Sequence, residues 1–192
     1  MPILRLPKGS LRDEIRIPLY DTITLESGYT PAGQRQFFSS VQGKPKSRTN
    51  LKANNILENS VSYRVQGLAL DVENIYHANK AVIPLLIQNS SVRVRIGEKD
   101  YWEGASLFLS GRMNEMTAGP AASTHQRLGD VAVQAVMLQG KHVIDINPLQ
   151  GFFAEWNVGD LSAAETALVA IAANTRLHFV FSFKGLLRRP VQ

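Results

Sequence analysis

The sequence predicts an all-β fold, a jelly-roll β-sandwich or barrel of about eight or more strands. Strand-like segments recur at intervals of roughly 8–14 residues, which is the spacing of such folds. A segment near the C-terminal end, 177–187, alternates between apolar and polar residues. Only one stretch, 162–174, has the features of a helix. We therefore expect at most one short helix, near 162–174, in a fold built otherwise from strands.

The segment 177–187 reads LHFVFSFKGLL and has the two-residue period of a strand. One face of this strand would carry Leu177, Phe179, Phe181 and Phe183. The opposite face would carry His178, Ser182 and Lys184, with Val180 among them. Because the first face is wholly apolar, we expect it to lie against the core and to complete a sheet.

The longest predicted strand, 61–72, changes its parity part way along. Val61, Tyr63 and Val65 share one face, whereas Leu68, Leu70 and Val72 follow the opposite parity. An extra residue at Gln66-Gly67 would restore the register, so the sequence predicts a β-bulge there.

The remaining strands are predicted from short apolar or alternating segments. These are Ile15–Tyr20, Gln34–Ser40, Val82–Gln88, 92–96, Tyr101-Trp102, Leu107–Leu109, Val131–Leu138, His142–Ile146 and Phe152–Val158. Gly97 to Asp100 reads as a turn between two of them. A capping box, Ser162-Ala163-Ala164-Glu165, favours a helix after it; the alternative is a loop followed by a strand through TALVAI.

Length and composition favour one domain, 1–192, with an N-terminal arm at about 1–13. The chain has no cysteine, which excludes disulfides, thiolate zinc sites and cysteine nucleophiles and suits assembly in a reducing cytoplasm. Prolines and charges interrupt the first residues, so we expect no secretion by a signal peptide. No apolar run approaches the ~20 residues of a membrane-spanning helix.

The net charge of +5 comes from one segment, 27–57, which contains no acidic residue. Its cations are Arg35, Lys44, Lys46, Arg48 and Lys52. This basic stretch would be a solvated loop, a surface for the phosphates of nucleic acid or lipid head groups, or a contact with a neighbouring subunit. No aromatic residue lies between Phe38 and Tyr63, which argues against base stacking. The glycine, proline, serine and asparagine among the cations favour the subunit contact.

The sequence offers no catalytic apparatus, metal site or cofactor motif. His77, His125, His142 and His178 are not spaced as metal ligands, and no phosphate-binding glycine motif is present. Ser123, His125 and Asp130 share one loop without the rigid frame of a catalytic triad. We expect no enzymatic activity.

Two tryptophans could line a sugar-binding groove. Trp102 and Trp156 each alternate with apolar neighbours, and Trp156 shares its parity with Phe152, Ala154 and Val158. Packing in the core or at a subunit interface is therefore the favoured interpretation.

The order of these parts resembles the small, single jelly-roll major capsid proteins of icosahedral tailless phages, including those with an internal membrane. The features that carry the resemblance are Tyr20-Asp21-Thr22-Ile23, Phe37-Phe38, Gln42-Gly43-Lys44, Thr49-Asn50, Leu68-Ala69-Leu70-Asp71-Val72 and the ending from Phe179 to Gln192. They cover most of the chain, which is too short for a double jelly roll.

This resemblance implies a structural virion protein that forms homo-oligomeric capsomers and tiles a shell. It implies assembly in the host cytoplasm, with other coat proteins, an internal membrane or the genome as further contacts. It transfers no catalytic residue. Two other classes remain open: a carbohydrate- or receptor-binding β-sandwich of the phage spike or fibre type, and a cupin-like enzyme on the same barrel.

Overall fold

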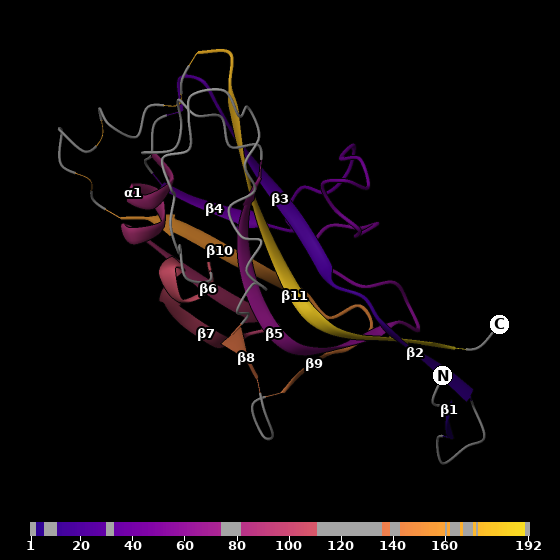
Figure 1. Ribbon diagram of the computed structural model, residues 1–192. Helices are drawn as coiled ribbons and strands as arrows, with labels where there is room; N and C mark the ends of the chain where they lie inside the picture. The colour runs from indigo at the N-terminus through magenta and orange to yellow at the C-terminus, as the bar shows by residue number, and fades with distance from the viewer. Residues whose placement is uncertain are drawn as a thin grey trace, which may run out of the picture.

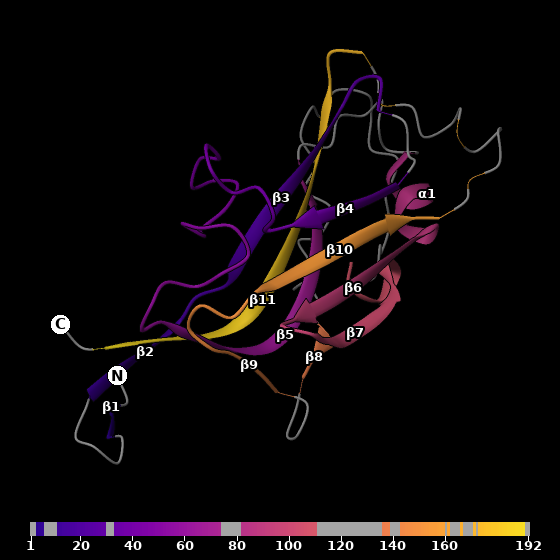
Figure 2. The same cartoon turned by 180° about the vertical axis from the view of Figure 1, so that it is seen from behind.

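Two antiparallel β-sheets face each other in a computed structural model of the chain (Figures 1 and 2). The model describes residues 3–5, 11–29, 33–73, 82–110, 136–138, 143–159, 161, 166, 171 and 173–190, and all that follows concerns these residues. The larger sheet contains β1 (Ile3–Arg5), β2 (Leu11–Arg16), β3 (Leu19–Glu26), β5 (Ser62–Glu73), β8 (Val136–Met137), β9 (Ile144–Ile146) and β11 (Arg176–Pro190). The smaller sheet contains β4 (Gly33–Phe37), β6 (Ser90–Ile96), β7 (Lys99–Ala105) and β10 (Phe152–Val158). One short helix, α1 (Val82–Gln88), and one 3₁₀ turn, η2 (Ser106–Phe108), complete the elements.

The strands pair in a nested order. Strand β3 pairs with β11, β4 with β10, β5 with β8 and β9, and β6 with β7, always antiparallel. Successive pairs lie in alternate sheets, so the sheet orders are β3-β11-β5-β8/β9 and β4-β10-β6-β7. This winding, in which β3 pairs with the last strand, β11, is that of a jelly roll and confirms the predicted all-β class.

The inner face of β11 forms the centre of the core, as the alternation predicts. Leu177, Phe179, Phe181 and Phe183 have no exposed surface. Phe181 packs against Phe37 of the opposite sheet, with 5.5 Å between the ring centroids. Phe183 stacks on Phe38 at 5.4 Å. Aromatic rings from both sheets therefore interdigitate between the layers.

The predicted bulge in β5 is confirmed. Lys184 of β11 is opposite Gly67 and Gly185 is opposite Val65, so Gln66 is the extra residue. Gly185 allows the two backbones to approach here, because a Cβ at this position would lie 1.9 Å from the carbonyl oxygen of Arg64. The bulge restores the inward parity on both sides of the kink.

Two predicted strands are helical turns instead. The segment Val82–Gln88 forms α1, in which Val82, Ile83, Leu86 and Ile87 are buried. This spacing is that of a helix face, and Pro84 is tolerated because the first turn needs no amide donor there. The predicted strand Leu107–Leu109 lies in η2 and the turn after it. Short apolar runs do not distinguish a buried strand from a buried helix.

The predicted strand Ile15–Tyr20 is also wrong, because a break divides it. Strand β2 ends at Arg16 and β3 begins at Leu19, with Pro18 between them. Both strands lie along the same edge of β11, β3 opposite 176–183 and β2 opposite 186–190. The helix expected near 162–174 falls almost wholly outside the described residues, among which Thr166 is helical.

One end of the larger sheet, here called the β-extension, consists of β1, β2 and residues 186–190 of β11 and runs beyond the smaller sheet (Figure 1). Its residues 186–188 also pair with β5. Both ends of the described chain lie at its tip. Arg188 Nε donates to Glu14 Oε1 at 2.6 Å and joins two of its strands.

Candidate functional site

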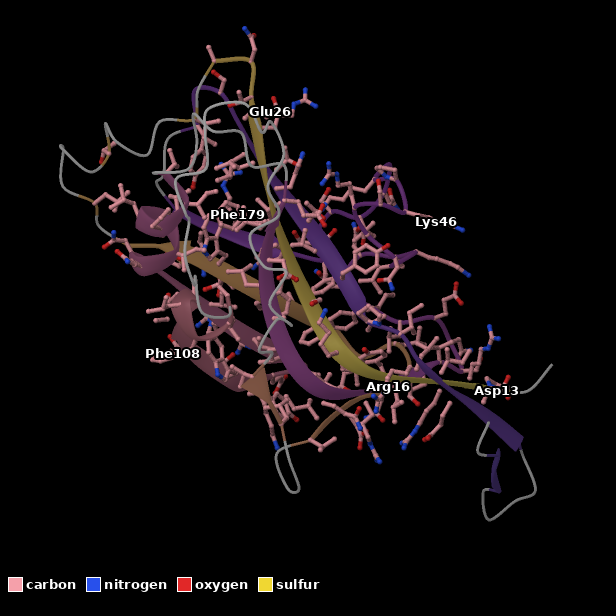
Figure 3. All side chains as sticks on the ribbon, viewed as in Figure 1. Asp13, Arg16, Glu26, Lys46, Phe108 and Phe179 are labelled. Carbon is pink, nitrogen blue, oxygen red and sulfur yellow. The ribbon has the colours of Figure 1, made fainter. Side chains whose placement is uncertain are left out.

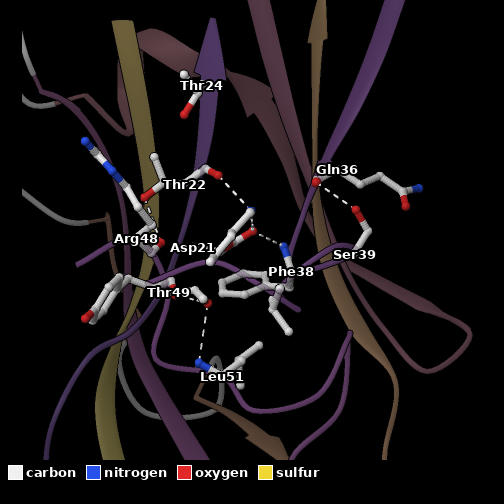
Figure 4. A network of polar contacts seen from close by, with 12 residues as sticks. Asp21, Thr22, Thr24, Gln36, Phe38, Ser39, Arg48, Thr49 and Leu51 are labelled. Carbon is white, nitrogen blue, oxygen red and sulfur yellow. Dashed lines mark hydrogen bonds and ion pairs between the residues drawn. The ribbon is translucent and has the colours of Figure 1, made fainter. Parts of the chain in front are cut away.

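The basic stretch leads from β4 into the loop that connects it to β5. The loop lies over β3, and Figure 4 shows the polar contacts that hold it there. Arg35 is on β4, and the other four cations are on the loop. Their surroundings decide whether they can serve a ligand, a neighbouring subunit or only the fold itself.

Lys44 neutralises a buried carboxylate. Asp21 is fully buried on β3, where it faces inward with Leu19 and Ile23. Lys44 Nζ donates to Asp21 Oδ1 at 2.8 Å and to Oδ2 at 2.9 Å. It also donates to the carbonyl oxygen of Thr22 at 2.8 Å. Because a buried charge needs a partner, the ammonium group of Lys44 is held by Asp21 and is not available to an external ligand.

The same carboxylate fixes an unusual backbone conformation. The amide of Phe38 donates to Asp21 Oδ2 at 2.7 Å, and Phe38 has a φ of 70°, in the left-handed region. This conformation is costly for a bulky residue. It turns the chain out of β4 while the Phe38 ring stays in the core, so Asp21 stabilises both the turn and the loop.

Arg48 crosses the outer face of the larger sheet. Its carbonyl oxygen accepts a hydrogen bond from Thr22 Oγ1 at 2.8 Å. Its guanidinium Nη1 lies 3.5 Å from Glu73 Oε2 on β5. The backbone of Arg48 is thus fixed firmly, whereas its side chain is held by one long contact.

The remaining three cations have different surroundings. Arg35 lies over the ring of Tyr29, 4.6 Å from its centroid. Lys52 Nζ pairs with Glu58 at 2.5 Å on an exposed surface. Lys46 projects into solvent (Figure 3), and no side chain among the described residues pairs with it. Four of the five predicted residues are thus engaged within the chain, and they do not form a row of free cations.

His178 lies on the outer face of β11, as its parity predicts, but it is buried rather than exposed. Its Nδ1 lies 2.9 Å from Thr24 Oγ1. Burial, together with the nearby guanidinium groups of Arg48 and Arg176, lowers the pKa of His178 from 6.5 to about 4. The ring is therefore neutral at pH 7.

This lowered pKa makes stability depend on pH. The unfolded chain protonates His178 near pH 6.5, whereas the folded chain does so near pH 4, so stability is retained above pH 6.5 and lost as the pH falls toward 4. We expect His178 to account for a loss of about 2 kcal/mol between pH 7 and pH 5. Urea unfolding at both pH values checks this expectation. A His178→Gln variant should lose about 2 kcal/mol less unfolding free energy between pH 7 and pH 5 than the parent protein. Equal losses in both proteins would contradict the buried, neutral histidine.

Trp156 lies in the core, in agreement with the favoured interpretation. It has no exposed surface and stacks on Phe179, with 4.6 Å between the ring centroids. Trp102, on edge strand β7, is partly buried against the same core. The two rings therefore do not form an exposed platform for a sugar.

Most of the other residues considered for chemistry are not among those that the structure describes. His77, His125, His142, Ser123 and Asp130 are not among the described residues. Among those that are, no group of three or more histidine, aspartate or glutamate side chains could hold a metal ion. Within the same residues, no helix has the length and hydrophobicity that crossing a lipid bilayer requires.

Asp21 is the residue that the sequence interpretation missed. It has the parity of Leu19, Ile23 and Leu25, and a single carboxylate on an otherwise apolar face is the signal that could have identified it.

Comparison of the chain with protein-family models, with curated proteins and with solved structures found no match.

Proposed function

We propose that the chain is a structural virion protein, a major capsid protein that self-associates into capsomers of an icosahedral phage shell. The observation that supports this proposal is the nested strand order, because it is that of a single jelly roll, the fold that the sequence resemblance implies. Fold alone does not assign function, so the proposal rests on the order together with the sequence features.

The β-extension is the part of the molecule that we assign to contacts between subunits. It continues the larger sheet beyond the part that faces the smaller sheet (Figure 1), and Leu187 at its base packs against the core. Strands with unpaired edges offer backbone donors and acceptors to a neighbouring chain. Symmetric copies that exchange such contacts build closed assemblies. Neighbouring coat proteins, an internal membrane or the genome would be further contacts of the shell.

Among the described residues, the tryptophan and histidine side chains that suggested the two alternative functions do not support them. A sugar-binding module would use exposed aromatic rings, but Trp156 is buried. A cupin-like enzyme would need inward-facing histidines around a metal. The one histidine among the described residues, His178, faces outward.

A charge exchange in the β-extension tests the proposal. Arg188→Glu places two carboxylates together, because the Glu14 side chain is only 12% exposed and faces Arg188. We expect this variant to keep the sandwich but to lose assembly, since repulsion between the two carboxylates separates β2 from the end of β11. The double variant Glu14→Arg/Arg188→Glu restores the opposite charges and should restore assembly.

Size-exclusion chromatography with light scattering measures the outcome, and circular dichroism confirms that the sheets persist. Particles from Arg188→Glu with the same mass and yield as the parent protein would refute a role of the β-extension in assembly. A parent protein that stays monomeric at high concentration across salt and pH would refute the capsid proposal itself.

A further inference from the structure

An open hollow of about 880 Å³ lies on the outer face of the larger sheet, where β3 ends and β11 begins. Glu26 marks this end of the molecule in Figure 3. The lining of this hollow includes Thr24, Glu26, Ser27, Arg48, Asn174, Arg176 and His178. Its volume is within the range of small-molecule sites, roughly 300–1,000 Å³.

Two guanidinium groups reach the hollow from different segments. Arg48 comes from the loop over β3, and Arg176 from the first position of β11. Arg48 contacts Glu73 at 3.5 Å, and Arg176 Nε contacts Glu26 Oε1 at 3.3 Å, the latter between side chains that are 65% and 64% exposed. The exposed Arg176–Glu26 pair contributes little, the Arg48–Glu73 pair is a single long contact, and each guanidinium has five N–H donors. Both groups therefore keep donors for a ligand.

The rest of the lining indicates what kind of ligand would fit. Thr24 and Ser27 supply hydroxyl groups, and Asn174 supplies an amide. No phenylalanine, tyrosine or tryptophan is among the lining residues, and the His178 ring is buried, so a nucleobase would have no exposed ring on which to stack. Polar groups around two cations suit an anion that carries hydroxyl groups.

We propose that this hollow binds the phosphate ester of a small, hydroxyl-rich molecule, such as a sugar phosphate, with the phosphate between Arg48 and Arg176. The planar guanidinium matches phosphate oxygens in a bidentate manner. Glu26 competes with the ligand for Arg176. Binding requires only the folded chain, so the inference is independent of the capsid proposal.

His178 provides a spectroscopic probe of the bound anion. The groups that face it are Arg48 from the loop, Arg176 from its own strand, Glu26 with Thr24 from β3, and Glu73 directly opposite on β5. The two guanidinium groups lower its pKa, together with burial. A phosphate that neutralises them should raise the pKa of His178, and protonation of His178 should in turn tighten binding.

Calorimetry with ribose 5-phosphate at pH 7 and low ionic strength tests the proposal, with ribose as the uncharged control. We expect a dissociation constant of about 1 mM or tighter. Arg176→Gln should weaken binding about tenfold or more, because charge-assisted hydrogen bonds to the phosphate are lost. Glu26→Gln should tighten it, because Arg176 loses its competing carboxylate. Lys46→Gln is the control for loss of one positive charge: Lys46 lies on the loop that carries Arg48 but outside the lining, and its loss should leave affinity unchanged.

Nuclear magnetic resonance adds a second readout. The imidazole signal of His178, assigned with a His178→Gln variant, should titrate at higher pH when ribose 5-phosphate is bound. Absence of saturable binding up to about 10 mM ribose 5-phosphate would overturn the site. A dissociation constant of that size corresponds to a binding free energy of less than roughly 3 kcal/mol. Equal weakening by Lys46→Gln and Arg176→Gln would also overturn it, because it would show unspecific charge attraction. Equal affinity for inorganic phosphate would overturn the assignment of a hydroxyl-rich ligand.

Discussion

Phe181→Ala is expected to lower the free energy of unfolding by about 3–5 kcal/mol and to remove most of the soluble protein. Phe181 has no exposed surface, and its ring contacts the rings of Phe37, Phe38 and Phe183 at centroid distances of 5.5, 6.2 and 5.3 Å. Truncation leaves a cavity where rings from both sheets meet. A loss of this size is a large part of the stability of a typical domain.

Urea unfolding of any soluble fraction measures the change. Val180→Ala is the matched control, because Val180 is the preceding residue of β11 and lies on its outer face, partly buried. We expect this control to lose clearly less stability than Phe181→Ala. Equal losses at the two positions would contradict the assignment of Phe181 to the inner face.

Lys44→Met is expected to lower the free energy of unfolding by about 3 kcal/mol, because it leaves Asp21 buried without a countercharge. The expected loss is at the lower end for a broken buried pair, since the Lys44 side chain is 27% exposed and water can reach its end of the pair. The double variant Asp21→Asn/Lys44→Met should recover at least half of this loss. Asparagine keeps an acceptor for the amide of Phe38 and carries no charge.

Lys46→Met is the control for this series, since Lys46 lies two positions along the same loop and projects into solvent (Figure 3). Surface substitutions of this kind change stability by about 0.5 kcal/mol or less. Urea unfolding of the four proteins checks the series. A Lys44→Met loss no greater than that of Lys46→Met would show that Asp21 does not depend on Lys44.

The sequence predicted the parts of the fold that depend on local alternation. Strand β10 has the predicted bounds, β11 presents the predicted face, and the parity change at Gln66 marks a real bulge. Each of these features leaves a periodic trace in a single segment. The runs at Val82–Gln88 and Leu107–Leu109 were misassigned because they are too short for their period to distinguish a strand from a helix.

The candidate site was less predictable, because its contacts join distant segments. The five cations were visible as a charge excess, but Lys44 and Asp21 are 23 positions apart and Arg48 and Glu73 are 25 apart. Neither pair has a spacing that local periodicity could reveal. The hollow depends in addition on Arg176. This residue lies far outside the basic stretch, and composition does not distinguish it from other arginines. Strand order is equally non-local, since β3 and β11 lie near opposite ends of the chain.

The most direct test of the capsid proposal is electron microscopy of the purified protein, after chromatography with light scattering has established its mass. The proposal predicts ring-like or closed, shell-like particles of uniform size, in which neighbouring subunits meet through β1, β2 and the end of β11. A clean monomer at every concentration, salt and pH tested would contradict it.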